Sequence, residues 1–150
     1  MGKLATLLMV GLAAACLNQI SDPSTKDKTF QASMLKWNDA MIQSYDLQMQ
    51  VECFCGAPTE PVLVTVRNRV IQSRTLTSSG SPVAAVDQRW FPDVPGLFAI
   101  VQDALNLPAA SLLVAYNVTY GFPIQIDVDY EGGVVDDQHH YAVVGFTIRQ

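Results

Sequence analysis

Alternation of apolar and polar residues between positions 112 and 130 constrains the fold of this chain more than any other feature. Two runs have an apolar residue at every second position, with a Gly121-Phe122-Pro123 turn between them: Leu112, Val114, Tyr116 and Val118, then Ile124, Ile126, Val128 and Tyr130. Successive side chains of a strand point to opposite faces, so each run has one apolar face. Gln125, Asp127 and Asp129 share the polar face of the second run. The pattern predicts an antiparallel sheet that is covered on one side only.

The same period of two predicts four further strands. The segment that begins at Tyr45 has a shared apolar face, and residues 61–67 and 70–76 follow it as successive antiparallel strands. The apolar face of that first segment consists of Leu47, Met49, Val51, Cys53 and Cys55. In the run from Tyr141 to Ile148, the predicted apolar side consists of Ala142, Val144, Phe146 and Ile148.

Two segments have helical spacing instead. Residues 25–44 carry an apolar stripe, and residues 97–105 carry a second one that Asp93 caps and Pro108 ends. The first stripe consists of Phe30, Met34, Trp37 and Met41, and the second of Leu97, Ile100, Val101, Ala104 and Leu105. The sequence therefore predicts one α+β domain over residues 29–150: an N-terminal helix, an antiparallel meander of three strands, a second helix and three further antiparallel strands, in one curved sheet with helices on one face.

Trp37, Trp90 and Phe91 are aromatic residues outside the predicted strands whose placement needs an argument. Trp37 belongs to the first helical stripe, so we expect it to anchor that helix against the sheet; a ligand-stacking platform is the alternative. Trp90 and Phe91 stand beside Pro92, and we expect them to be tucked over the edge of the sheet rather than exposed as a contact patch.

The N-terminus has the layout of a secretory signal peptide. A basic start is followed by the apolar run Leu4–Leu12 and by small residues that end at Cys16. Small residues before a cysteine resemble the lipobox of bacterial lipoproteins, although Ala13 stands where that motif usually has Leu. We expect residues 1–16 to be a lipoprotein-type signal peptide with Cys16 carrying acyl chains such as palmitate, and residues 17–28 to be a tether. The alternative is an ordinary signal peptide cut near Ala15. Either form places the domain outside the cytoplasm, and the lipid would anchor it to an envelope membrane, facing the periplasm or the exterior.

Chain length and net charge limit the kinds of partner that this chain can bind. The 150 residues suffice for one domain with a core, and the formal net charge is -5, from 9 basic and 14 acidic side chains. Phosphate contacts need clustered Lys and Arg; the nearest group, Arg67, Arg69 and Arg74, fits a solvated hairpin face. We expect a monomer that binds no nucleic acid, and partners consisting of the membrane, through the lipid, and an unknown envelope protein or small ligand.

The Cys53-Phe54-Cys55 segment is interpreted through its compartment. Thiols outside the cytoplasm are usually oxidised, and lipid on Cys16 leaves an even pair, so a structural disulfide between Cys53 and Cys55 is the economical reading. Two residues apart on one strand face, their Cα atoms start near the upper limit of disulfide geometry, so the bond requires a local bulge or twist, which Gly56 and Pro58 favour. The alternatives are a redox-active pair and, less favoured, a metal site.

A further set of residues carries a family resemblance. In order, these are Trp37, Tyr45, Cys53-Phe54-Cys55, the helix with Phe98, Tyr116-Asn117, Gly121-Phe122-Pro123, Ile126-Asp127, Asp136-Asp137 and Tyr141. Their combination resembles the bacterial envelope family of domains of unknown function 6174, over about residues 29–146. The resemblance implies a secreted or lipid-anchored small α+β domain and transfers no catalytic role. This chain departs from the family pattern at Arg69, where a turn glycine is expected, and at Gln138, where an acidic residue often follows the Asp136-Asp137 pair.

Carboxylates crowd the segment after residue 126. Asp127, Asp129, Glu131, Asp136 and Asp137 surround Gly132 and Gly133, and oxygen ligands of this kind suit a hard cation such as calcium. Gln138 stands where an EF-hand loop needs a bidentate Glu, and Asp127 and Asp129 belong to a strand, so we do not expect an EF-hand. A looser calcium site is the low-ranked hypothesis. The favoured interpretation is that the carboxylates solvate a sheet face and a turn, with no cofactor and no firm metal ligand.

His139 and His140 are adjacent, so on a strand they point to opposite faces and cannot share one metal. Either could act as a general base with a nearby Asp, but Ser73 and Ser111 lack a nucleophile-elbow pattern and no phosphate-binding glycine loop is present. We therefore expect an envelope lipoprotein that binds a partner or ligand through its open sheet face or its acidic loop, and that is not an enzyme. The alternative is a secreted thiol-redox protein or hydrolase that uses Cys53 and Cys55 or a His-Asp pair.

Overall fold

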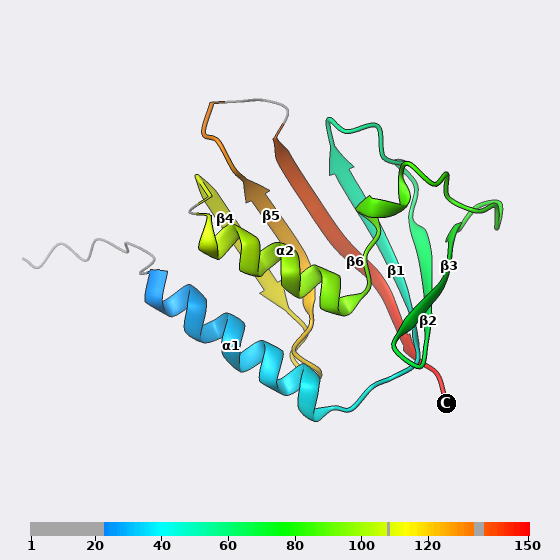
Figure 1. The fold of residues 1–150 in the computed structure, drawn as a ribbon, viewed down its shortest axis with the longest axis horizontal. Coiled ribbons are helices and arrows are strands. Elements are labelled where there is room, and N and C mark those ends of the chain that lie inside the picture. The colour runs from blue at the N-terminus through cyan, green and yellow to red at the C-terminus, as the bar shows by residue number, and fades with distance from the viewer. Residues whose placement is uncertain (1–22, 108, 134–136) are drawn as a thin grey trace, which may run out of the picture.

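The computed structural model describes residues 23–107, 109–133 and 137–150 (Figure 1). Within these residues, two α-helices and an antiparallel six-stranded sheet make the fold α+β, as predicted. In chain order the elements are α1 (Pro23–Asp39), β1 (Tyr45–Cys53), β2 (Val62–Arg67), β3 (Val70–Leu76), the 3-10 helix η1 (Gln88–Trp90), α2 (Val94–Asn106), β4 (Ser111–Tyr116), β5 (Pro123–Asp129) and β6 (Gln138–Ile148).

The sheet joins two halves of the chain at its centre. The strand order is β3-β2-β1-β6-β5-β4, so the first and last strands pair with each other. This pairing runs antiparallel from Tyr45 opposite Ile148 to Cys53 opposite His139, with a bulge between Gln48 and Met49. As a result, the last residues of β1 and β5 and the first residues of β6 meet at one end of the sheet, where the candidate site lies.

The bulge corrects the predicted face of β6. Ala142 pairs with Gln50 on the polar side of β1, and Val144 lies within the bulge with 52% of its surface exposed. The core side of β6 instead carries Tyr141, Val143 and Phe146. The prediction for Ala142 and Val144 was wrong because apolar residues follow one another along this strand, so alternation alone does not select a face.

Both helices pack on one face of the sheet; in Figure 1 α2 crosses in front of β5, and α1 runs below α2. Trp37 of α1 is only 7% exposed and packs edge-on against Tyr45 and Phe122, so it anchors the helix as predicted. The helix ends at Asp39, short of the predicted Ser44, and Met41 follows with a positive φ of 54° and an exposed side chain. Met41 therefore does not belong to the core stripe.

The helix arrangement differs from the prediction in one respect. The β1–β3 half of the same face is covered by the segment around η1 instead of by a helix (Figure 1). Phe91 is fully buried there, as expected, while Trp90 is partly buried. Arg74 Nε donates to the Phe91 carbonyl oxygen at 2.6 Å, and Val83 N donates to the Arg74 carbonyl oxygen at 2.9 Å. These bonds hold the linker against β3.

The predicted leader lies outside the described residues. The signal peptide of residues 1–16, with the lipidated Cys16, falls in the undescribed segment 1–22. Residues 23–28, predicted as the end of the tether, belong to α1. Among the residues that the structure describes, no helix is both long enough and apolar enough to cross a membrane.

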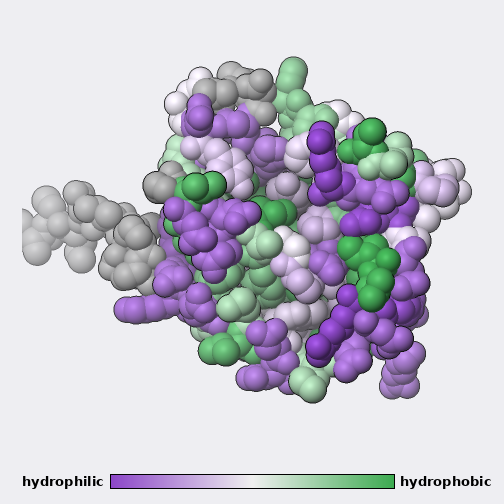
Figure 2. Space-filling model, viewed as in Figure 1, coloured by the Kyte–Doolittle hydropathy of each residue, from purple (hydrophilic) through white to green (hydrophobic). Residues whose placement is uncertain are grey.

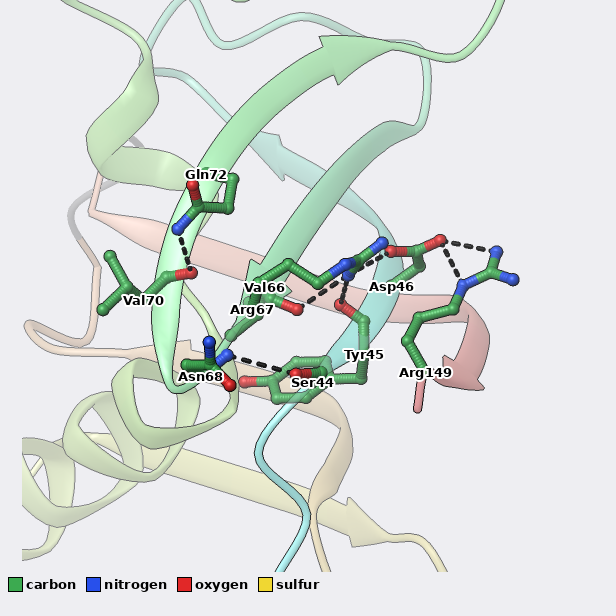
Figure 3. Close-up of polar contacts among 9 residues, drawn as sticks. All are labelled: Ser44, Tyr45, Asp46, Val66, Arg67, Asn68, Val70, Gln72 and Arg149. Atoms are coloured by element: carbon green, nitrogen blue, oxygen red, sulfur yellow. Dashed lines mark hydrogen bonds and ion pairs between the residues drawn. The ribbon is translucent and has the colours of Figure 1, made fainter.

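A cluster of charged residues lies on the uncovered face at the start of β1, at the opposite end of that strand from the candidate site (Figure 3). Asp46 Oδ1 lies 2.8 Å from Arg67 Nη1, and Asp46 Oδ2 lies 2.6 Å from Arg149 Nη2. Burial alone raises the pKa of Asp46, but the hydrogen bonds from Arg149 and Arg67 outweigh it and hold the pKa below its ordinary value. The cluster therefore ties β2 and the C-terminal residues to the start of β1.

The β2–β3 turn beside this cluster is strained. Asn68 and Arg69 both have positive φ, 51° and 65°. Arg69 N donates to the Gln43 carbonyl oxygen at 2.7 Å, and Asn68 N donates to Ser44 Oγ at 3.1 Å (Figure 3). The turn therefore needs two left-handed residues, which explains why a glycine is expected where this chain has Arg69.

Candidate functional site

The uncovered face of the sheet carries a row of ionisable side chains across three strands. Asp127 of β5 pairs with His140 of β6, and His140 pairs with Glu52 of β1. Leu113 of β4 extends the row on the other side of Asp127. Directly opposite residues in antiparallel strands have Cβ atoms about 4.5–5.5 Å apart, so His140 lies between two acidic residues in the row.

Hydrogen bonds set the charge of this row. Asp127 Oδ1 is bonded to His140 Nδ1, and Asp127 Oδ2 accepts from Gln125 Nε2 at 2.6 Å. Burial raises the pKa of Asp127, but the bonds from His140 and Gln125, together with the charge of His140, outweigh it and lower the pKa. Asp127 is therefore ionised at neutral pH, and Glu52 is the exposed carboxylate of the row.

A shallow cavity of about 430 Å³ lies at this end of the sheet. Its lining includes the charged row, Asp129, Ser111 and Phe54, which has 85% of its surface exposed. Figure 2 shows the helix side of the molecule, where exposed hydrophobic residues are scattered among hydrophilic ones. The cavity thus combines negative charge with an exposed aromatic ring.

The predicted acidic loop does not gather into one cluster among the described residues. Asp127 binds His140, Asp129 Oδ2 accepts from Gln138 Nε2 at 3.4 Å, and Asp137 Oδ2 accepts from Glu131 N. Asp136 lies outside the described residues. Over residues 23–107, 109–133 and 137–150, no three His, Cys, Asp or Glu side chains come together as a metal site would require. Calcium binding stays a prediction.

The two histidines point to opposite faces, as predicted. His140 is in the charged row on the open face, whereas His139 lies opposite Cys53 and Val128 on the helix side. The His139 ring stacks on Trp90, with centroids 5.3 Å apart. The two rings therefore have different neighbours and different chemistry.

The cysteines are adjacent in space. The two sulfur atoms of Cys53 and Cys55 are in contact, and their Cα atoms are 5.1 Å apart, within the range that a disulfide requires. The chain turns after Cys53, where β1 ends, and Gly56 has a positive φ of 75°. The expected departure from regular strand geometry is present. A disulfide would close a small ring around Phe54.

Ser111 lies in the same cavity as the His140–Asp127 pair, but it is not placed as a nucleophile. Ser111 pairs with Asp129, two positions along β5 from Asp127, and β4 is separated from β6 by β5. Two strand spacings amount to about 10 Å, beyond hydrogen-bond reach of His140. The geometry gives the hydrolase alternative no serine nucleophile here.

Fold and site together define a small α+β domain with a one-sided antiparallel sheet and ionisable groups on its open face. The chain belongs to the family of unknown function DUF6174, which matches residues 29–148. The resemblance seen in the sequence is therefore confirmed, and it extends over all six strands and most of α1. No curated protein and no solved structure matches the chain.

Sequence reasoning missed two neighbours of the histidines. Alternation along the strand puts Glu52 on the polar side of β1 and Cys53 on its apolar side, but it connects neither residue to His140 or His139. Those connections follow from the β1–β6 register, which joins the two ends of the domain. The sequence offers one indication of these contacts: His139 and His140 face opposite sides of their strand, and β1 has one polar and one apolar side.

Proposed function

We propose that this chain is a lipid-anchored envelope protein whose open sheet face binds a cationic group of a partner molecule. The observation that carries the proposal is the cavity at the ends of β1, β5 and β6, which brings Glu52, Asp127 and Asp129 beside exposed Phe54. The signal-peptide layout ending at Cys16 supports the address and the lipid anchor.

The charges of the cavity favour a cation as the occupant. Carboxylates line it, the formal net charge of the chain is -5, and Phe54 offers a ring face to an ammonium or guanidinium group. A Cys53–Cys55 disulfide would hold Phe54 in place, so little side-chain freedom would be lost on binding. A lysine- or arginine-rich segment of an envelope protein meets these requirements.

The test is binding of a fluorescently labelled octalysine peptide to the full-length chain, followed by anisotropy at increasing salt. An exposed charge pair contributes about 0.2–1 kcal/mol, so each neutralised carboxylate should weaken binding about threefold. The triple variant Glu52→Gln, Asp127→Asn, Asp129→Asn should therefore lose at least about tenfold in affinity. Binding should also weaken as salt shortens the range of the charges.

A matched control separates a local site from overall charge. The triple variant Asp39→Asn, Asp87→Asn, Asp103→Asn changes the net charge by the same three units, but these residues lie in α1, directly before η1 and in α2, away from the cavity lining. This control should keep the affinity within about twofold of the unchanged chain. If both triple variants lose the same affinity, or if octalysine does not bind at all, the proposed cavity is not the binding site.

A further inference from the structure

Cys53 and His139 occupy directly opposed positions of β1 and β6 on the helix side of the sheet. Cβ atoms of such pairs lie about 4.5–5.5 Å apart, so one sulfur of the Cys53–Cys55 pair has an imidazole as its cross-strand neighbour. A neighbouring histidine is one of the groups that lower the pKa of a cysteine thiol and make it reactive. Cys55 lies beyond the end of β1, so the β1–β6 register places no histidine opposite it.

The structure also fixes which nitrogen of His139 can take a proton. Its Nδ1 lies 3.1 Å from the carbonyl oxygen of Asp137, and a carbonyl oxygen only accepts hydrogen bonds. In the neutral ring Nδ1 therefore carries the hydrogen, and Nε2 holds the free lone pair. The stack on Trp90, with planes 25° apart, and a second stack on Tyr141 hold the ring in this orientation.

The pair is reachable from solvent. Cys53 and Cys55 are both partly exposed, and Cys53 lines the cavity described above together with His139. Phe54 between them is 85% exposed, and Cys53 is partly buried against the core, so the bridge lies at the boundary between core and surface. A structural disulfide needs neither access nor a basic neighbour, whereas a bridge that exchanges with an external thiol needs both.

We propose that the Cys53–Cys55 disulfide is redox-active and exchanges with the dithiol of a partner protein, with His139 as its acid–base group. This activity goes beyond the proposed binding function and does not depend on it. His139 Nε2 accepts the proton of the first partner thiol, and the resulting thiolate attacks Cys55 Sγ. The Cys53–Cys55 bond breaks, its electron pair remains on Cys53 Sγ, and protonated His139 returns the proton to that thiolate.

The second partner thiol completes the exchange. Its thiolate attacks the partner sulfur of the mixed disulfide, the bond to Cys55 breaks, and Cys55 receives the second proton. Two electrons have passed from the partner dithiol to the bridge. The partner leaves as a disulfide, and this chain leaves as the Cys53, Cys55 dithiol.

The experiment uses the full-length chain with Cys16→Ser, which leaves Cys53 and Cys55 as the two remaining cysteines. Adding Cys55→Ser leaves the thiol beside His139, and adding Cys53→Ser leaves the other. The rate of alkylation by iodoacetamide is measured from about pH 5 to about pH 9. Cys53 should react at least about tenfold faster than Cys55 at neutral pH, and His139→Gln should remove that advantage and shift the pH profile upward.

Only a few charged or titratable groups near His139 can affect the pH dependence of the alkylation rate. Around His139, these are the Cys53 thiol on β1, the Tyr141 hydroxyl on β6 and the Arg89 guanidinium, which lies 4.7 Å from the Trp90 ring. Burial raises the pKa of Tyr141 to about 12, so this tyrosine stays neutral over the measured range. A feature of the pH profile that disappears with His139→Gln therefore reports the imidazole.

A second measurement keeps the bridge intact in case the single-cysteine variants fail to fold. The oxidised chain is mixed with excess dithiothreitol, and His139→Gln should slow reduction by about tenfold. Unfolding would expose the bridge and speed reduction, so slower reduction is not a consequence of lost structure. Equal alkylation rates for the two cysteines, or unchanged or faster reduction in His139→Gln, would overturn the proposal.

Discussion

Gly121→Ala should detach α1 from the turn between β4 and β5. Gly121 has a φ of 81°, and a Cβ atom there would overlap the carbonyl oxygen of Ser33 and lie 2.9 Å from Lys36 Cβ. Neither side can move away easily. Lys36 Nζ donates to the Val118 carbonyl oxygen at 2.8 Å, and Asn117 Oδ1 accepts from two backbone N–H groups of the same turn.

The magnitude has two parts. Placing alanine at a positive φ costs about 1 kcal/mol, and forcing an extra methyl into a packed contact costs about 1–3 kcal/mol. The free energy of unfolding should therefore fall by about 2–4 kcal/mol, which for a domain of this size lowers the melting temperature by about 10 °C. Urea unfolding followed by circular dichroism measures the loss.

Gly80→Ala is the matched control for Gly121→Ala. Gly80 has a φ of 71°, but no atom lies within 4 Å of a Cβ placed there. This variant should lose only the backbone part, about 1 kcal/mol. Equal losses in the two variants would refute the reasoning, because they would mean that close packing of α1 on the turn contributes nothing.

Three further predictions concern charge, strain and calcium. Asp46→Asn should lower the free energy of unfolding by about 1–2 kcal/mol at neutral pH, because the carboxylate is only 12% exposed and binds two arginines. The pKa of Asp46 is lower in the folded chain than in the unfolded one, so this stabilisation is present above about pH 4 and is lost as the pH falls further. The acid side of a stability–pH curve should therefore be flatter in the variant. Arg69→Gly should raise the free energy of unfolding by about 0.5–1 kcal/mol because it relieves a positive φ of 65° and keeps the backbone bond to Gln43; a lower melting temperature would contradict this. Calcium at about 1 mM should leave the melting temperature unchanged because Asp127, Asp129 and Asp137 already have hydrogen-bond partners; a rise of several degrees would show that they rearrange around the ion.

The local pattern was sufficient for features that depend on neighbouring residues. Alternation predicted the strands and the one-sided sheet, and adjacency predicted that His139 and His140 face opposite ways. It failed where several apolar residues follow one another, as in β6, because either face then satisfies the pattern. It also failed at the end of α1, because the side chain of Met41 gives no sign that its backbone leaves the helix.

The candidate sites depend on a single long-range pairing. The sequence by itself determined the residue types, the two strand faces and the cysteine pair, since these follow from the chemistry and spacing of neighbours. Only the tertiary structure decided that β6 returns to lie beside β1, which brings Glu52 to His140 and Cys53 to His139. The physical reason is that register between distant strands is chosen by burial of the whole apolar face and by one bulge, and no local run of residues encodes that choice.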